Sequence, residues 1–516
     1  MGVRKFNNKL KISKSSNVMS IEGSITWEYL KNVADTLDSY RVRALIDAKE
    51  DILNAGVYSE DQYYTLVFKM FDEELLKYSL FEFLKSTPNA NFETIKKFSQ
   101  KNSLEPKKVY GLLELLKSEK IVNFDEVYDK IESEGEGDPP KLVFRDFKID
   151  PFRGNVSQIK SIYEPVEIIF NSKLCSGCGT CAGVCPVNCL KIYNGFGQID
   201  KEKCIRCGIC YFVCPRSHLP VKILSMYQGN TSEIKEYTNI GHFKQVYSAR
   251  TKLKEISEVC QDGGISSTCL YYLFDNQKID FALGAKMSNT IWRPEPLLLK
   301  SKEDITQTSG TKYVNNPTLQ ILNEFNSSKH NVAVVGVPCM MQALLKSDIY
   351  NIGIPSLNNV KYKIGIFCME SFSYESLLKI CKVLSVNIND VKKMDINKGK
   401  FFVYTHNNKE YFVPIKEISH LAREDCEVCF DLTSESADIS VGSIGSPPGW
   451  NTVIVRTDNG KGLFEALIAN DLIESKPIED VTPGLPMLQK IAGNKKNGCK
   501  KHINEKKEKN LRIPIY

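Results

Sequence analysis

The stretches "CSGCGTCAGVCP" (residues 175–186) and "CIRCGICYFVCP" (residues 204–215) decide the first part of the fold. Each has the spacing Cys-x2-Cys-x2-Cys-x3-Cys-Pro, and every cysteine of the second lies 29 positions after its counterpart in the first. This indicates an internal duplication. The spacing is typical of two [4Fe–4S] cubes, in which three thiolates of a tight loop bind one cube and the fourth binds the cube of the other repeat.

The duplication assigns eight cysteines to two clusters. One set is Cys175, Cys178, Cys181 and Cys214, and the other is Cys204, Cys207, Cys210 and Cys185. Gly177, Gly179 and Gly208 let the backbone wrap the clusters closely. Two zinc sites are the alternative, but structural zinc rarely uses eight thiolates in this interleaved spacing. The module, residues 165–225, resembles a bacterial-type two-cluster ferredoxin. Cys189 lies outside the pattern and is predicted to be a small buried side chain.

Length and composition place the chain among charge-mixed multidomain proteins. Its 516 residues suggest several domains, and 68 basic against 62 acidic residues give a net charge of only +6. No apolar run is long enough for a membrane span, and the N-terminus lacks a secretory signal. We therefore expect a cytoplasmic protein, with peripheral attachment to a membrane complex as the other arrangement compatible with the sequence. In that compartment most of the 17 cysteines are expected to be metal or redox ligands.

Helical periodicity and local composition divide the rest of the N-terminal half into three segments. We expect a helical region at 1–85, a winged-helix-like module at 86–135 and a linker at 136–164, where "ESEGEGDPPK" is acidic and rich in Gly and Pro. A winged helix can bind DNA through its second helix or serve as a docking module. Lys107, Lys108 and Lys117 form only a thin basic face, which favours docking without nucleic acid.

Beyond the cysteine module, short apolar strands alternate with helices. The fold class is therefore α/β, within an α+β multidomain chain, with a mixed sheet in the domain at 240–475. Residues 476–516 are basic and polar, and are expected to form a surface arm. In "SEVCQDGGISSTCLYYLF", Gly263 and Gly264 open a helix, where backbone N–H groups and the helix dipole favour a pyrophosphate.

A series of motifs in this domain resembles a known family. The motifs are "QDGGISS", "SGTKYV", "VGVPCMMQAL", "IGIFCMESFSY", "DINKGKFFVY", "REDCEVCFDLTSESADISVGSIG" and "GWNTVIVRTDNG". In this order they resemble the beta-subunit family of coenzyme F420 hydrogenases and dehydrogenases, most closely the F420H2 dehydrogenase input subunit. The resemblance covers about 165–475, and the first 150 residues have no counterpart in the minimal family member. It implies an FAD, a coenzyme F420 site and one further [4Fe–4S] cluster.

Four cysteines match the ligands of that further cluster. They are Cys339, Cys368, Cys426 and Cys429. The pair Cys426 and Cys429, taken alone, is typical of a redox dithiol or half a zinc site. Four unrelated buried cysteines are another possibility, since Cys260, Cys269, Cys381 and Cys499 show that cysteines occur outside any ligand pattern.

The cofactor contacts are predicted from the glycine-opened helix and from the motifs of the resemblance. They are Gln261, Asp262, Gly263, Gly264, Ile265, Ser266, Ser309, Gly310, Thr311, Lys312, Tyr313, Val337, Pro338, Lys398, Gly399 and Lys400. The lysines are candidates to bind phosphate as point charges, although each could equally be a solvated surface lysine. No catalytic side chain is assigned, because the cofactors carry the hydride transfer.

The predicted function is a flavin iron–sulfur oxidoreductase. Hydride passes between coenzyme F420 and FAD, and single electrons pass through three [4Fe–4S] clusters to or from a redox partner in a larger complex. That partner would be a ferredoxin or a component of a heterodisulfide-reductase-like, hydrogenase or membrane dehydrogenase complex. Two alternatives remain open: a ferredoxin-dependent reductase of the same fold that acts on a chlorophyll-type pigment, and a DNA-binding regulator that senses redox state.

Overall fold

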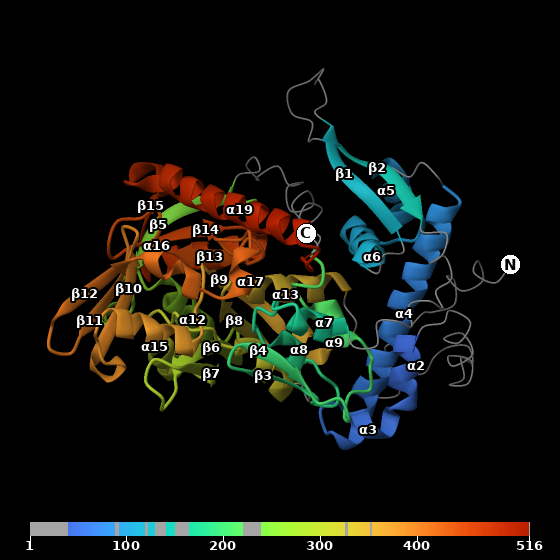
Figure 1. Cartoon of the computed structure of the whole chain (residues 1–516), viewed down its shortest axis with the longest axis horizontal. Helices are drawn as coiled ribbons and strands as arrows, with labels where there is room; N and C mark the ends of the chain where they lie inside the picture. The colour runs from blue at the N-terminus through green and yellow to red at the C-terminus, as the bar shows by residue number, and fades with distance from the viewer. Residues whose placement is uncertain are drawn as a thin grey trace.

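The computed structural model describes residues 40–87, 92–118, 122–129, 141–149, 165–219, 239–325, 329–350, 353–514 and 516. Figure 1 shows three parts: a large α/β domain, the cysteine module, and the N-terminal helices on the far side of that module. In the described residues, no helix is both long enough and apolar enough to cross a membrane.

The N-terminal part is helical and ends in a two-stranded sheet. Its elements are α2 (Tyr40–Asp47), α3 (Lys49–Asn54), α4 (Glu60–Lys85), α5 (Phe92–Lys101), α6 (Pro106–Ser118), β1 (Val122–Asp129) and β2 (Lys141–Ile149). A capping box starts α4: Ser59 Oγ accepts from Gln62 N at 3.3 Å, and Gln62 Oε1 accepts from Ser59 N at 2.9 Å.

The position of β2 corrects the predicted linker. Strands β1 and β2 pair antiparallel, from Val122 opposite Ile149 to Asp129 opposite Lys141. Residues 141–149 therefore belong to the sheet that follows the helix pair, and not to a linker. The acidic, Gly/Pro-rich composition before Lys141 suits the connection between two strands as well as a domain boundary. The remainder of the predicted linker lies outside the described residues.

Helix α6, the second helix of the winged-helix pattern, packs against α13 (Pro338–Tyr350) of the α/β domain. Lys108 Nζ donates to the carbonyls of Ile349 and Tyr350 at 3.2 and 3.0 Å, and also pairs with Glu73. A methyl group on Gly111 would lie 2.5 Å from an Ile349 methyl. This contact occupies the helix that would enter a DNA groove, so the packing favours the docking interpretation.

The cysteine module is built from short elements. They are α7 (Pro165–Asn171), α8 (Thr180–Gly183), β3 (Leu190–Tyr193), β4 (Phe196–Ile199) and α9 (Ile209–Val213). The duplication is visible in the backbone: α8 and α9 both follow a left-handed glycine, Gly179 at φ 88° and Gly208 at φ 72°. A side chain at either position would be strained, which explains the glycine in both repeats.

The α/β domain contains an eight-stranded mixed sheet, as the sequence predicts. Its strands, in spatial order, are β15 (Ile473–Pro477), β5 (Gln245–Thr251), β14 (Asn451–Val455), β13 (Ile439–Gly442), β9 (Val360–Ile366), β8 (Val332–Gly336), β6 (Phe281–Met287) and β7 (Pro294–Leu299). Strands β13, β9, β8 and β6 are parallel, and their neighbours on both sides are antiparallel. The carboxyl ends of the parallel strands thus share one edge, where ligands of open α/β sheets bind.

Helices cover both faces of this sheet. On one face, α12 (Ile265–Asp275) and α18 (Asp458–Ala469) pack on Ala333 and its neighbours. On the other, α13 packs on Val332 and Val334 and joins a core shared with the cysteine module and the N-terminal helices. This shared core fixes the module beside the sheet.

A second, three-stranded sheet lies beyond the carboxyl edge of the large one (Figure 1). It consists of β10 (Val391–Asn397), β11 (Lys400–Thr405) and β12 (Glu410–Pro414), with α15 (Tyr374–Val383) packed on it. The remaining short elements are α11 (Lys254–Ser257), α14 (Pro355–Asn358), α16 (Ile415–Ile418), α17 (Glu424–Glu427), η3 (Lys302–Thr308), η4 (Thr318–Phe325), η5 (Ile388–Asp390), η6 (Ser419–Leu421) and η7 (Ile478–Asp480).

The expected surface arm is instead a long docked helix, α19 (Gly484–Glu508). Leu488, Ala492, Lys495 and Cys499 are buried at spacings of three and four residues. The prediction was wrong because this narrow buried stripe is scattered among lysines and asparagines, so the segment as a whole looks polar. Tyr516 also turns inward, and its hydroxyl donates to the Val428 carbonyl at 2.7 Å.

Candidate functional site

The structure brings the first predicted cysteine group together. Cys175, Cys178 and Cys181 are buried in the loop around α8, and Cys214 follows α9. Burial raises the pKa of Cys181 well above its ordinary value, and the nearby thiols of Cys175, Cys178 and Cys214 raise it further. Such crowding is unfavourable for free thiolates, whereas bound iron would displace their protons.

The thiols of the second group line a common cavity. Cys204, Cys207 and Cys210 of the second repeat line it together with Cys185 of the first repeat. The fourth thiol thus comes from the other repeat, which is the interleaved arrangement proposed from the spacing. The other lining side chains are largely apolar, including Val166, Leu190, Ile199 and Ile209.

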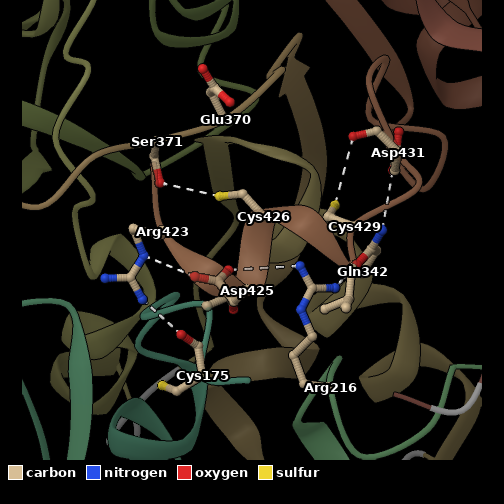
Figure 2. A network of polar contacts seen from close by, with 12 residues as sticks. Cys175, Arg216, Gln342, Glu370, Ser371, Arg423, Asp425, Cys426, Cys429 and Asp431 are labelled. Atoms are coloured by element: carbon tan, nitrogen blue, oxygen red, sulfur yellow. Dashed lines mark hydrogen bonds and ion pairs between the residues drawn. The ribbon is translucent and has the colours of Figure 1, made fainter. Parts of the chain in front are cut away.

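The third group lies at the carboxyl edge of the large sheet. Cys339 begins α13 just after β8, Cys368 follows β9, and Cys426 and Cys429 are in and just after α17. Burial raises the pKa of Cys426, and Asp425 and Cys368 raise it further. Ser371 Oγ lies 3.7 Å from Cys426 Sγ (Figure 2).

A single metal ion and a cluster ask different things of these thiols. A zinc ion would draw its thiolates to about 2.3 Å from one centre, whereas a [4Fe–4S] cube binds each thiolate at a different iron. Among the residues that the structure describes, no group of three or more His, Cys, Asp or Glu side chains is arranged to hold one metal ion.

The three groups form a series. Cys339 of the third group lies near Cys178 of the first, and both burial and that neighbour raise its pKa. Cys210 of the second group in turn lies near Cys214 of the first. The first group is therefore in the middle, between the sheet edge and the N-terminal helices.

A buried ionic network connects the third group to the first (Figure 2). Asp425 Oδ1 accepts from Arg423 Nε at 2.9 Å, and Asp425 Oδ2 lies 3.9 Å from Arg216 Nη2. Arg423 also donates to the Cys175 carbonyl at 2.7 Å, and Arg216 donates to the Tyr516 hydroxyl at 2.9 Å. Asp425 is thus the central acid between two buried cations, each from a different part of the chain.

Lys495 of α19 places another buried cation beside the third group. Its Nζ donates to the Cys368 carbonyl at 2.5 Å. Burial acts to lower the pKa of Lys495, but the nearby thiols of Cys429, Cys368 and Cys426 outweigh it and raise that pKa. A cation here would compensate the negative charge of a thiolate-bound cluster.

Sequence reasoning missed these charged residues. Arg423 and Asp425 both precede Cys426 within "REDCEVCF", and Arg216 follows Cys214 and Pro215. A charged residue within three positions of a predicted ligand cysteine was therefore the available signal. Lys495 offered none, because it lies in a polar tail far from the cysteines in the sequence.

The glycine-rich loop at the predicted flavin site is held mainly by protein contacts. A methyl group on Gly263 would lie 2.5 Å from Asn451 N and 2.6 Å from the Ala249 carbonyl. Gly264 is left-handed, with φ 72°, and Ile265 N donates to Asn451 Oδ1 at 3.2 Å. The packing and backbone conformation of the protein itself therefore require glycine at both positions, whether or not a ligand binds there. Ser266 follows on the first turn of α12.

The motifs at 261 and 309 meet beside β10. Gln261 Nε2 donates to the Met394 carbonyl at 3.4 Å. Burial raises the pKa of Tyr313, and the carboxylates of Asp395 and Asp262 raise it further. Tyr313 O also accepts from Phe372 N at 2.9 Å, which ties this region to the segment carrying Cys368. Val337 and Pro338 directly precede Cys339 of the third group. Thr311 lies in the same loop as Tyr313.

The other glycine and lysine candidates lie in turns. Gly310 is left-handed with open space around it, but Ser309 and Gly310 give their carbonyls to Lys312 Nζ at 2.7 and 3.0 Å. Lys398 and Gly399 both have positive φ, 47° and 73°, as a two-residue hairpin between β10 and β11 requires. Lys400 Nζ lies 3.7 Å from the centroid of the Phe412 ring.

Lys312 gives a pH-dependent prediction. Burial lowers its pKa from 10.5 to about 8. Between these values the folded protein binds fewer protons than the unfolded chain, so its stability rises with pH through this window. We expect the stability of the wild type relative to Lys312→Met to increase between about pH 8 and 10, measured by anaerobic thermal unfolding. A pH-independent difference would contradict the burial of a titrating amine at this position.

The cysteine module docks on the α/β domain by backbone contacts. Leu319 N donates to the Cys178 carbonyl at 3.1 Å, and Asn315 Nδ2 donates to the Ser176 carbonyl at 2.7 Å. A methyl group on Gly183 would lie 2.1 Å from the Leu319 carbonyl. This close approach holds the first cysteine group against the α/β domain.

Three family models match successive segments of the chain. A "4Fe-4S dicluster domain" matches residues 167–215. The N-terminal and C-terminal models of the coenzyme F420 hydrogenase/dehydrogenase beta subunit match residues 246–323 and 329–481, respectively. Residues 40–149, with the helices and the small sheet, lie outside all three.

Curated relatives agree with these models. The beta subunit of the coenzyme F420 hydrogenase of Methanothermobacter thermautotrophicus is 37% identical over 279 residues, which is 53% of this chain and 99% of the relative. The F component of the F(420)H(2) dehydrogenase of Methanosarcina mazei is 34% identical over 349 residues, 65% of this chain and 93% of the relative. A chain in the structure of the F420-reducing [NiFe] hydrogenase complex from Methanosarcina barkeri is 37% identical, with a TM-score of 0.52 over 54% of this chain and 97% of that one.

Proposed function

The chain belongs to the coenzyme F420 hydrogenase/dehydrogenase beta-subunit family, and on that premise we propose a specific activity for it. It transfers hydride between coenzyme F420 and an FAD, and single electrons through three [4Fe–4S] clusters to or from a partner protein. When bound, the flavin supplies the exchange between a two-electron hydride donor and one-electron clusters.

The observation that carries this proposal is the series of three cysteine groups. Four thiols gather at the carboxyl edge of the sheet, and eight more continue from there through the module. A single structural metal site would not need three adjoining groups. A series of this kind suits one-electron transfer from a site at the sheet edge to a distant surface.

Buried charged side chains lie along the series of cysteine groups. Arg216, Arg423 and Lys495 are buried cations next to predicted ligands, and they would offset the charge of bound clusters. Asp425 holds the two arginines in place. We assign the flavin to the carboxyl edge near Gln261 and Tyr313, because Gln261 contacts β10 and Tyr313 contacts the segment that carries Cys368.

The second group would bind the last cluster of the series, farthest from the sheet edge. The N-terminal helices cover this group. The hydroxyl of Tyr58, before α4, donates to the Val184 carbonyl at 3.3 Å, and the Arg41 guanidinium lies 4.8 Å from the centroid of the Phe212 ring. We therefore place the partner protein near the N-terminal helices that cover the second group. Copurification under anaerobic conditions would identify that partner.

Reduced coenzyme F420 provides the direct test of the activity. The anaerobically purified protein should contain about twelve irons and one FAD per chain. Adding reduced coenzyme F420 should bleach the flavin absorbance, followed by partial bleaching of the iron–sulfur absorbance, because electrons leave the flavin singly. A stopped-flow spectrometer measures both changes.

Two outcomes would contradict the proposal. About eight irons per chain would remove the third cluster while leaving the ferredoxin module intact. A flavin that stays oxidised with reduced coenzyme F420, yet is reduced by a ferredoxin, would favour the alternative reductase acting on another substrate.

A further inference from the structure

Cys189, which the ligand spacing leaves out, lines the cavity of the second cysteine group. Its Sγ lies 3.4 Å from Cys185 Sγ, and its backbone N–H donates to the same sulfur at 3.4 Å. Its side chain also hydrogen-bonds to Cys204. Five thiols therefore surround this cavity, and one of them is in contact with two of the predicted ligands.

The backbone holds Cys185 and Cys189 at the same corner of the cavity. Asn188 takes a left-handed conformation, with φ 51°, and its N–H donates to the Cys185 carbonyl at 3.3 Å. Directly after this turn, the Cys189 carbonyl accepts from Asp200 N at 2.8 Å. The turn brings the chain back on itself, so both thiols reach one point although four residues separate them.

The internal duplication provides a comparison. The position equivalent to Cys189 in the second repeat, 29 residues later, is His218. Its ring is engaged on both sides, since Nδ1 lies 3.2 Å from Ser217 Oγ and Nε2 lies 2.5 Å from the Tyr350 hydroxyl. The first group therefore has no second thiol beside Cys214 at this position.

We propose that Cys189 is a reserve ligand of the second cluster. While Cys185 binds the iron, the Cys189 S–H donates a hydrogen bond to the Cys185 sulfur. Where Cys185 is absent, Cys189 loses its proton to solvent and forms the Fe–S bond in its place, with no change in the oxidation state of the cluster. The inference rests on the proposed function in requiring that the second group binds a [4Fe–4S] cluster.

Iron content tests the exchange directly. We compare wild type, Cys185→Ala, Cys185→Ala/Cys189→Ala and Cys214→Ala, each purified anaerobically at full length. Wild type and Cys185→Ala should both contain about twelve irons per chain, and the other two variants about eight. Cys214→Ala is the matched control, because it removes the equivalent ligand where no spare thiol exists. Electron paramagnetic resonance of the reduced proteins identifies which cluster is lost.

The outcomes separate this inference from the function on which it rests. If wild type contains about twelve irons and Cys185→Ala about eight, the reserve-ligand inference is overturned and the proposed clusters stand. If wild type itself lacks the second cluster, the proposed function fails at that group.

A second variant keeps the contact testable should Cys185→Ala fail to fold. Cys189→Ala retains all predicted ligands but removes the hydrogen bond to the Cys185 sulfur. Because a hydrogen bond to a ligand sulfur favours the reduced cluster, its loss should lower the midpoint potential of the second cluster alone. Cys269→Ala, a buried cysteine in α12 away from all three groups, should shift none. Unchanged potentials in Cys189→Ala would show that its thiol does not touch the cluster ligand.

Discussion

Replacing Cys426 with alanine should leave flavin reduction by coenzyme F420 intact and block the exit of electrons. Cys426 is a predicted ligand of the third cluster, next to the flavin site, so the hydride acceptor would remain while its first one-electron acceptor is lost. Iron should fall from about twelve to about eight per chain. Reduction of the ferredoxin clusters should slow by at least about tenfold, the effect of a barrier raised by ~1.4 kcal/mol. Stopped-flow spectra at flavin and iron–sulfur wavelengths measure the two steps separately.

The control for this variant is Cys381→Ala. Cys381 is buried in α15 against the three-stranded sheet, outside all three cysteine groups. It should keep about twelve irons and normal electron exit. A Cys426→Ala protein that keeps its iron but loses stoichiometric zinc would identify the Cys426–Cys429 pair as half of a zinc site. A protein that loses neither metal would make the pair a simple dithiol.

The two-cluster module was predictable from the sequence because its ligands are local. Within each repeat, three thiols lie on one short loop, and the left-handed glycines, Gly179 and Gly208, repeat at the same offset as the cysteines. The position of the fourth thiol follows from the duplication. The cavity is lined by Cys185 together with Cys204, Cys207 and Cys210, and also by Cys189, which the spacing leaves out.

The charged surroundings of the third group were less accessible to sequence reasoning. Lys495 reaches Cys368 only because α19 folds back over the sheet, and its polar composition hides the buried stripe. Likewise, the Gly/Pro-rich stretch before Lys141 has the same composition whether it separates domains or joins two strands. Such features depend on tertiary packing, which local periodicity does not encode.

The flavin candidates illustrate a different difficulty. Glycines and lysines were selected because a phosphate could use them, yet Gly263 is required by Asn451 and Ala249, and Lys312 binds carbonyls of its own turn. A residue type that suits a ligand often suits a turn equally well. Contacts from one distant segment to another, such as Gln261 with Met394 and Tyr313 with Phe372, are what distinguishes a site from isolated turns.

Asp425 lies where the α/β domain and the cysteine module meet. It is buried between Arg423, whose guanidinium donates to the Cys175 carbonyl, and Arg216, two residues after the predicted ligand Cys214. Removing one partner of a buried ionic network leaves the others without compensation, and the cost is larger than the strength of the contact itself. Asp425 is therefore expected to contribute more to the stability of the fold than its position on a one-turn helix suggests.

Asp425→Ala should destabilise the protein by about 3–5 kcal/mol, because two buried guanidinium groups lose their only shared carboxylate among the described ion pairs. The matched control is Glu424→Ala, which removes the neighbouring exposed carboxylate and its 2.7 Å pair with Lys173, worth at most about 1 kcal/mol. Anaerobic urea titration, followed by iron–sulfur absorbance, measures both. Similar midpoints for the two variants would mean that Arg216 and Arg423 do not depend on Asp425 for their burial.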